Sequence, residues 1–196
     1  MIKCVIFDFG DTLVQTRLAN KKTTKNRPEL KLLKDKGFQI TKSQLDKATQ
    51  RMLEETKDLT IQQKQNDKTI FARTLLQELG INPSKKLAIE CENLYYSELR
   101  KNMKLMPNAV KLLEFLKQKK IMACVLSNTR IGSNLIVAKK LGIRKYFKHF
   151  IMSHLFGSVK SELKIYNHLL ERINKERSPN ILQENGLQGI NEENDP

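Results

Sequence analysis

The stretch that most constrains the fold is the run from Cys4 to Leu13, in which an apolar segment ends in one carboxylate and a glycine-containing loop. Residues 3–7, followed by Gly10, have the length and the boundary that are typical of a buried strand. Open α/β sheets bind ligands at the carboxyl ends of their strands, which is where Asp8 would lie. Asp8 is therefore a candidate nucleophile, and the alternative from this fragment alone is a residue that only caps a turn.

Two further motifs follow in a fixed order along the chain. An apolar run at 121–126 ends in Ser127 and Asn128, and Lys160 follows the segment 156–159. Together with the first motif, this ordered set resembles the haloacid dehalogenase superfamily of hydrolases. In that family the first strand ends in the nucleophilic Asp, the second ends in a Ser or Thr, and a Lys follows the third.

The resemblance implies a role for each of these residues. Asp8 would attack phosphorus and form an aspartyl-phosphate that water then hydrolyses, and Lys160 would neutralise the charge on the phosphoryl group. Thr12, Ser127 and Asn128 would bind that group, together with the backbone amides of the loop at 9–12. The substrate implied in this way is a small phosphorylated metabolite.

The resemblance also implies Mg²⁺, held by the Asp8 carboxylate and the backbone carbonyl of Gly10. Phosphatases of the family carry a second Asp at the position of Gly10, where it serves as the general acid for the leaving group. Loss of a positioned acid costs about 10²–10⁴ in rate, so we expect a preference for good leaving groups such as acyl or aryl phosphates. Asp11 is a weak substitute because the neighbouring side chain normally points elsewhere. Halide release needs no acid, so a 2-haloacid dehalogenase that uses the same nucleophile remains an alternative.

The C-terminal part departs from the family a second time. Residues 178–182 begin a fourth strand, which in the family ends in Gly-Asp and a further acid that hold the metal, but Gln183 and Glu184 follow here. The fourth motif is missing, and a truncation or frameshift after about residue 182 explains the change in composition more simply than a ligand role for Glu184. Residues 184–196 are predicted to be a disordered tail. A catalytically impaired homologue that only binds anionic ligands is therefore a third hypothesis.

The remaining pattern predicts an α/β fold. Alternating strand and helix patterns indicate a Rossmann-like parallel sheet with helices on both faces, formed by residues 1–15 and 105–183. Residues 16–104 have helical periodicity and match, in position and helix content, the helical cap that the family inserts after its first strand. Such a lid excludes water and selects the substrate.

Two local predictions concern the helices. The polar, cationic segment 20–27 is interpreted as a mobile loop at the entry to the cap. Residues 162–173 are predicted to form a helix whose inward side chains are Leu163, Tyr166, Leu169 and Leu170.

The formal net charge of +15 invites a nucleic-acid interpretation. The excess is spread along the chain with few aromatic residues among the lysines, so a basic surface that steers small anionic substrates is favoured over specific nucleic-acid binding. No apolar run approaches the roughly 18 residues of a membrane span, and the chain starts directly with a strand, so we expect a cytoplasmic protein that does not bind membranes. The three cysteines lack metal-like spacing and are expected to be reduced structural thiols.

Overall fold

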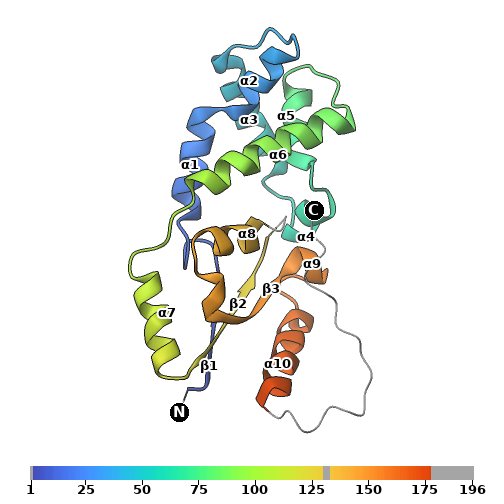
Figure 1. The fold of residues 1–196 in the computed structure, drawn as a ribbon. Coiled ribbons are helices and arrows are strands. Elements are labelled where there is room, and N and C mark those ends of the chain that lie inside the picture. The colour runs from blue at the N-terminus through green and yellow to red at the C-terminus, as the bar shows by residue number, and fades with distance from the viewer. Residues whose placement is uncertain (1, 130–132, 178–196) are drawn as a thin grey trace.

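The computed structural model describes residues 2–129 and 133–177. Within these residues, strands β1 (Cys4–Phe7), β2 (Met122–Ser127) and β3 (Phe147–Met152) form a parallel sheet in the order β1-β2-β3 (Figure 1). Ile6 lies opposite Cys124 in this register. The predicted α/β fold with a parallel sheet is confirmed. Because all strands run the same way, their carboxyl ends share one edge of the sheet.

Helices cover both faces of the sheet. Helices α7 (Ala109–Gln118) and α8 (Ser133–Lys140) lie on one face, and α10 (Leu163–Arg177) lies on the other (Figure 1). Successive side chains of a strand point to opposite faces, so Val125 of β2 packs in the cluster with α7 and α8 whereas Leu126 packs with α10. The core of this half of the molecule is thus two apolar layers separated by the sheet.

The inward face of α10 differs from the predicted one. Its buried side chains are those of Ile165, Leu169 and Ile173. Of the four predicted residues only Leu169 is buried, and the exposed ones are Leu163, Tyr166 and Leu170. Two apolar stripes run along this helix at helical spacing, and periodicity cannot say which one meets the sheet. The prediction of the buried stripe was wrong, because the orientation of the helix against the sheet decides which stripe is buried.

Between β1 and α7 the chain forms a separate helical layer, which we call the helical insertion. Its helices are α1 (Thr16–Asn26), α2 (Pro28–Asp35), α3 (Lys42–Thr56), α4 (Ile61–Asn66), α5 (Ile70–Glu78) and α6 (Lys85–Asn102). Thr41 and Thr60 begin α3 and α4 with capping boxes, in which each threonine accepts from the third residue of its helix. The layer buries its own apolar cluster, which includes Leu33, Leu45 and Leu76. It lies over the carboxyl ends of the strands (Figure 1).

The segment 20–27, which was predicted to be a mobile loop, is helical almost to its end. It belongs to α1, where Ala19 and Thr23 are buried against α6. Asn20 accepts a hydrogen bond of 3.2 Å from the Tyr95 hydroxyl, and Thr23 accepts one of 3.2 Å from the Asn102 amide. This helix has almost no apolar stripe, so side-chain hydrogen bonds and tertiary packing, rather than local pattern, decide its structure.

The chain passes between the sheet and the helical insertion twice, at neighbouring places. Val14 and Leu105 form an antiparallel bridge. The Gln15 amide donates to the Lys104 carbonyl at 2.8 Å, and the Met106 amide donates to the Leu13 carbonyl at 2.9 Å. The two crossings therefore form a paired, two-stranded connection between the layers.

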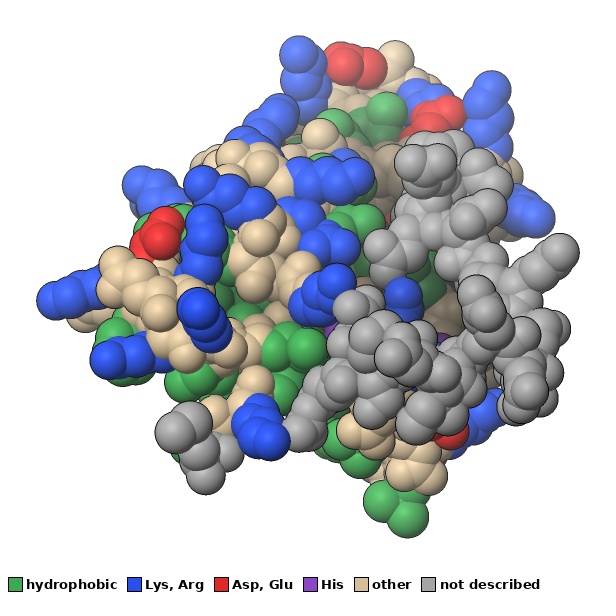
Figure 2. Space-filling view, turned by 60° about the horizontal axis from the view of Figure 1, so that its bottom comes forward, with side chains coloured by type: hydrophobic (Ala, Val, Ile, Leu, Met, Phe, Trp, Pro, Cys, Tyr) green, Lys and Arg blue, Asp and Glu red, His purple; other side chains and the backbone are tan. Residues whose placement is uncertain are grey.

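Several expectations concern charge and the C-terminal part. Figure 2 shows Lys and Arg side chains scattered over the viewed face among few acidic ones, rather than gathered in one patch.

No helix among residues 2–129 and 133–177 has both the length and the apolar character needed to cross a bilayer. The predicted fourth strand at 178–182 and the tail at 184–196 lie outside the described residues.

Candidate active site

Asp8 lies directly after β1, and the loop that follows holds its side chain in place. Phe9 and Leu13 are buried, and the Leu13 amide donates to the Phe9 carbonyl at 3.0 Å, which closes a tight turn. The Phe9 amide donates to Asp8 Oδ1 at 2.7 Å. The carboxylate is therefore oriented by the loop that the glycine-containing motif forms.

Lys160, in the segment that follows β3, lies against the same carboxylate. Its Nζ lies 2.7 Å from Asp8 Oδ1, and the two side chains are 24 % and 47 % exposed. The backbone amide of Lys160 donates to Asn128 Oδ1 at 2.9 Å. The three motifs therefore meet at one place, with a cation against one oxygen of the candidate nucleophile. The Phe9 amide and Lys160 both contact Oδ1, so Oδ2 is the oxygen that we expect to attack.

Ser127 ends β2 and is buried, with 2 % of its surface exposed. Its Oγ accepts a hydrogen bond of 3.0 Å from Asn134 Nδ2, a residue in the first turn of α8. A hydroxyl that already accepts keeps its own hydrogen for donation, which suits it to a phosphoryl oxygen. Sequence reasoning missed Asn134, and its position seven residues after Ser127 was the only signal for it.

Asn128 and Thr12 differ in how they relate to the site. Asn128 lines the cavity above Asp8, but its Oδ1 is engaged by the Lys160 amide, so it positions the loop that carries the cation. Thr12 is exposed in the turn after Asp8 and is not among the residues that line the cavity. From that turn and the start of α1, Gly10 and Thr16 line it instead. The predicted contacts of Thr12 and Asn128 with a phosphoryl group stay predictions.

Neither Asp11 nor the space beside Gly10 offers a replacement for the missing general acid. Asp11 adopts a φ of +53° and its Oδ1 accepts from the Thr16 and Arg17 amides, both at 2.9 Å, which caps the first turn of α1. A Cβ at Gly10 would lie 3.0 Å from Thr16 Oγ1. The space next to Gly10 on the side of the cavity is therefore filled by the Thr16 hydroxyl, and Asp11 faces the helix.

Two of the loop amides predicted to bind the phosphoryl group already donate hydrogen bonds within the protein. The Phe9 amide donates to Asp8, and the Asp11 amide donates to the Val14 carbonyl at 2.7 Å. Fewer amides of this loop therefore remain to meet an anion than the prediction assumed.

The donor atoms beside Asp8 are of the kind that Mg²⁺ prefers, but they are few. The Asp8 carboxylate and the Gly10 carbonyl are hard oxygen donors, which Mg²⁺ prefers. Among the described residues there is no cluster of three or more His, Cys, Asp or Glu side chains that could hold a metal ion. An ion held by Asp8 and Gly10, without a further ligand from the described residues, would keep most of its ligands as water.

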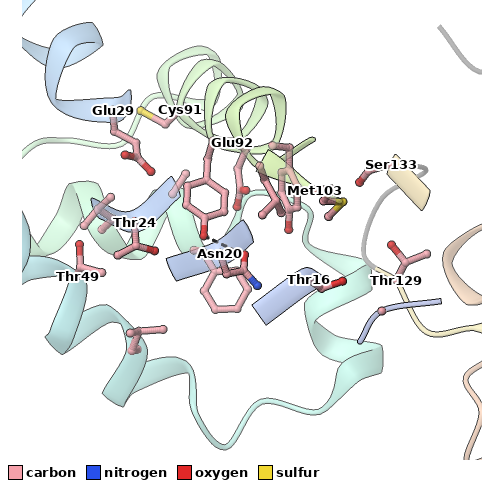
Figure 3. A pocket seen from close by; sticks show the side chains of 18 of the residues that line it. Thr16, Asn20, Thr24, Glu29, Thr49, Cys91, Glu92, Met103, Thr129 and Ser133 are labelled. Carbon is pink, nitrogen blue, oxygen red and sulfur yellow. Dashed lines mark hydrogen bonds between the residues drawn. The ribbon is translucent and has the colours of Figure 1, made fainter. Parts of the chain in front are cut away.

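A cavity of about 590 Å³ runs from Asp8 into the helical insertion. At the sheet end it is lined by polar residues of the first two motifs, and its walls farther up are partly apolar, with Met52, Phe71 and Leu75. Its far end is polar again, as Figure 3 shows for Thr24, Glu29 and Thr49. A space of this size takes a small organic molecule rather than a phosphoryl group alone.

Two charged residues lie at the far end, Glu29 buried and Arg27 partly buried. Glu29, in the first turn of α2, is 7 % exposed, and its burial raises the pKa of its carboxyl; Glu92 adds to the rise, and its own backbone amide and Arg27 oppose it. Arg27 adopts a φ of +47° between α1 and α2. Its Nε and Nη2 both lie 2.6 Å from Asp46 Oδ1, and its Nη1 donates to Thr49 Oγ1 at 3.1 Å.

The three cysteines carry free thiols. Burial raises the pKa of Cys91 and that of Cys124 to about 12, so neither is a thiolate at neutral pH. Cys91 lines the cavity but is therefore no candidate nucleophile. This agrees with a structural role for the buried thiols.

Comparisons with known proteins point in the same direction as the geometry. The family model of the haloacid dehalogenase-like hydrolases matches residues 2–180. No curated protein matches the chain.

Several solved structures share the fold. A HAD-hydrolase from Bacillus subtilis, bound to magnesium, matches with a TM-score of 0.61 and 19% identity over 87% of this chain and 74% of its own. A protein described as a β-phosphoglucomutase from Thermotoga maritima matches with a TM-score of 0.61 and 20% identity over 88% and 71%. The 2-haloacid dehalogenase from Pseudomonas syringae matches with a TM-score of 0.59 and 20% identity over 89% and 74%. At these identities the likeness establishes the fold alone.

Proposed function

Because the chain belongs to the haloacid dehalogenase-like hydrolases, we propose that it hydrolyses a small phosphorylated metabolite through an aspartyl-phosphate on Asp8. The observation that carries the proposal is the contact of 2.7 Å between Lys160 Nζ and Asp8 Oδ1, at the floor of a cavity that has room for an organic molecule. A carboxylate that meets a cation at a cavity floor is equipped to attack an anionic phosphorus centre.

In the first step Asp8 Oδ2 attacks phosphorus, and the bond from phosphorus to the leaving oxygen breaks. Lys160 offsets the negative charge at the reacting centre, and the Ser127 hydroxyl donates to a non-bridging oxygen. In the second step water attacks the same phosphorus, which releases phosphate and regenerates the Asp8 carboxylate. Mg²⁺, held by Asp8 and the Gly10 carbonyl, would supply further positive charge when bound.

Leaving-group preference is the most specific consequence. No carboxyl group stands at Gly10, and Asp11 is engaged at the start of α1. The leaving oxygen must therefore depart without a positioned proton donor from this loop. We expect acyl and aryl phosphates to be hydrolysed much faster than alkyl phosphates.

The test is hydrolysis of an activated aryl phosphate and an acyl phosphate by the pure protein, with and without Mg²⁺. Asp8→Asn is expected to abolish turnover, and Lys160→Met to lower kcat by about 10²–10³. Lys164→Met, which removes a lysine whose Nζ lies over the Phe156 ring, is the matched control and should leave kcat unchanged. If the folded wild-type protein hydrolyses neither substrate, the proposal is wrong, and a homologue that only binds anions becomes the better hypothesis.

Dehalogenation is a second candidate, favoured by the glycine at position 10. A halide leaves without a proton, so the missing acid costs nothing in that reaction. Asp8 would displace the halide from a 2-haloacid to form a carboxyl ester, and water would then hydrolyse the ester. Metal-independent halide release that is lost in Asp8→Asn, without phosphate ester hydrolysis, would favour this candidate over the first.

A further inference from the structure

The far end of the cavity differs chemically from its floor. The floor presents the Ser127 hydroxyl and Asp8, whose carboxylate is paired with Lys160, and this pairing suits an anion. The far end presents the carboxyl groups of Glu29 and Glu92 (Figure 3). In a chain with a formal net charge of +15, a buried cavity end with two carboxyl groups is an unusual local environment. The two ends therefore suit opposite charges.

Glu29 is the residue on which the inference depends. It is 7 % exposed, and its carboxyl group points into the cavity (Figure 3). It accepts a hydrogen bond from its own backbone amide, and in the part of the chain that the structure describes no other side chain hydrogen-bonds or ion-pairs with it. A carboxyl group buried in this way is normally paired. Because Glu29 has no partner side chain in the described part of the chain, its carboxyl group can accept a hydrogen bond from a ligand.

Arg27, whose charge lowers the pKa of Glu29, is already engaged. Its guanidinium group is held by Asp46 at 2.6 Å and by Thr49 at 3.1 Å. Turning toward Glu29 would break the contact with Asp46, whose carboxylate is the partner of Arg27. The charge of Glu29 therefore has no dedicated counter-ion on the protein among the described residues.

A purely structural role accounts for part of this arrangement. Glu29 lies in the first turn of α2, where a negative charge is favourable with the helix dipole. An exposed carboxylate would serve that purpose equally well and would avoid the cost of burial. The helix dipole therefore explains the residue type at this position, and it leaves the orientation into the cavity unexplained.

We propose that Glu29 binds a protonated amino group at the end of the substrate that is remote from the phosphoryl group, so that the substrate is a phosphorylated amine. This inference rests on the proposed function for the phosphoryl end. The apolar walls at Met52, Phe71 and Leu75 suit an alkyl segment between the two charged ends. The ammonium group supplies the donors that Glu29 lacks, and Glu92 lies at the same end of the cavity to add attraction.

The first experiment compares ω-aminoalkyl phosphates with alkyl phosphates of the same chain length, over a series of lengths. For the wild-type protein we expect kcat/KM to favour the amine by tenfold or more at the best length, since a charged hydrogen bond is worth about that factor. In Glu29→Gln this preference is expected to fall by about tenfold. Glu171→Gln, an exposed carboxylate on α10, is the matched control and should keep the preference. A wild-type protein that turns over both series without preference overturns the inference.

The second experiment is binding without turnover, which separates this inference from the proposed function. Asp8→Asn protein is titrated calorimetrically with an n-alkylamine that carries no phosphate, and the titration is repeated with the additional change Glu29→Gln. Binding that is lost with Glu29→Gln supports the amine site even if no phosphate ester is ever hydrolysed. Binding of equal strength in both proteins, or none in either, counts against the amine site even if phosphatase activity is present.

Discussion

At the scale of single residues, the chemistry of this site depends on which groups are already engaged. Asp8 Oδ1 is held by Lys160 and by the loop, which leaves Oδ2 to react. Asp11 looks in the sequence like a substitute acid, but its carboxylate caps α1. The side-chain oxygen of Asn128 accepts from the Lys160 amide, so that oxygen is engaged in positioning the segment that carries Lys160. Residue type alone therefore overestimates the number of groups that are free to meet a substrate.

The first prediction concerns the missing acid. Gly10→Asp alone is expected to be hindered, because its Cβ would lie 3.0 Å from Thr16 Oγ1. The double variant Gly10→Asp/Thr16→Ala removes that oxygen and should raise kcat for alkyl phosphates by about tenfold or more, because a positioned acid assists a poor leaving group.

The measurement is kcat for an alkyl and an aryl phosphate in parallel, with Thr16→Ala as the control for the cleared space. A gain confined to the alkyl phosphate supports a restored acid. An equal gain for both substrates, or the same gain in Thr16→Ala alone, would show that proton donation is not the reason.

The second prediction is a pH dependence of stability. Burial raises the pKa of Glu29 above its usual 4.5, so the folded chain binds its proton at a higher pH than the unfolded chain does. The free energy of unfolding therefore falls as the pH rises through that interval, and this loss persists at neutral pH. Glutamine cannot ionise, so Glu29→Gln should be stabilised relative to the wild type at about pH 8 and much less so at about pH 4. Urea unfolding at both values tests it, and a stability difference that does not grow with pH contradicts the assignment.

At the scale of elements, two helices show what pattern recognition misses. Helix α10 carries two apolar stripes and buries the one that includes Leu169. Helix α1 carries almost none and is held by polar contacts to α6. In both cases the neighbouring element decides which side chains are buried.

The third prediction uses the two adjacent leucines of α10 as a matched pair. Leu169 is fully buried and Leu170 is 48 % exposed. Leu169→Ala should lower the free energy of unfolding by about 2–5 kcal/mol because it leaves a cavity in the packed layer. Leu170→Ala should cost less than about 1 kcal/mol. Chemical denaturation measures both, and equal losses would mean that the helix does not present the face described above.

The fourth prediction concerns α4, one of the helices of the insertion that contact the sheet layer. Gln65 Nε2 donates to Ser153 Oγ at 2.6 Å, and Ser153 Oγ in turn accepts from the Thr129 amide at 3.0 Å. These two hydrogen bonds connect the insertion to the loop that follows Ser127. Gln65→Ala should lower kcat/KM severalfold, mainly through KM, because a hydrogen bond between the insertion and the sheet layer beside the cavity is lost.

Steady-state kinetics of Gln65→Ala beside Gln50→Ala, an exposed glutamine on α3, measures the effect. The control should behave like the wild type. If both variants match the wild type, the contact between α4 and Ser153 has no part in substrate binding.

At the scale of the whole molecule, the distribution of charge decides which ligands the surface attracts. The basic side chains are scattered over the face shown in Figure 2 instead of forming one patch. This distribution agrees with a general attraction of small anions. On that face it forms no single basic patch to which a nucleic acid would bind. The absence of specific nucleic-acid binding stays a prediction.

The fifth prediction follows from the net charge of +15. A basic surface raises the local concentration of anionic substrates, and salt screens this attraction over a Debye length of about 8 Å at physiological ionic strength. For a phosphate substrate, kcat/KM should fall about threefold or more between low and high salt, whereas kcat should stay nearly constant. A parallel loss of kcat would instead point to salt effects on the chemical step or on folding.

The sequence by itself determined the fold class and the three motifs. An apolar strand that ends in Asp8, a second that ends in Ser127 and the later Lys160 are local signals, and parallel strands necessarily bring such residues to one edge. Only the tertiary structure decided which groups remain available, because hydrogen-bond partners come from distant segments, as Asn128 does for Lys160. It also decided the buried stripe of α10 and the polar far end of the cavity around Glu29. These depend on how the helices approach one another, which local periodicity does not encode.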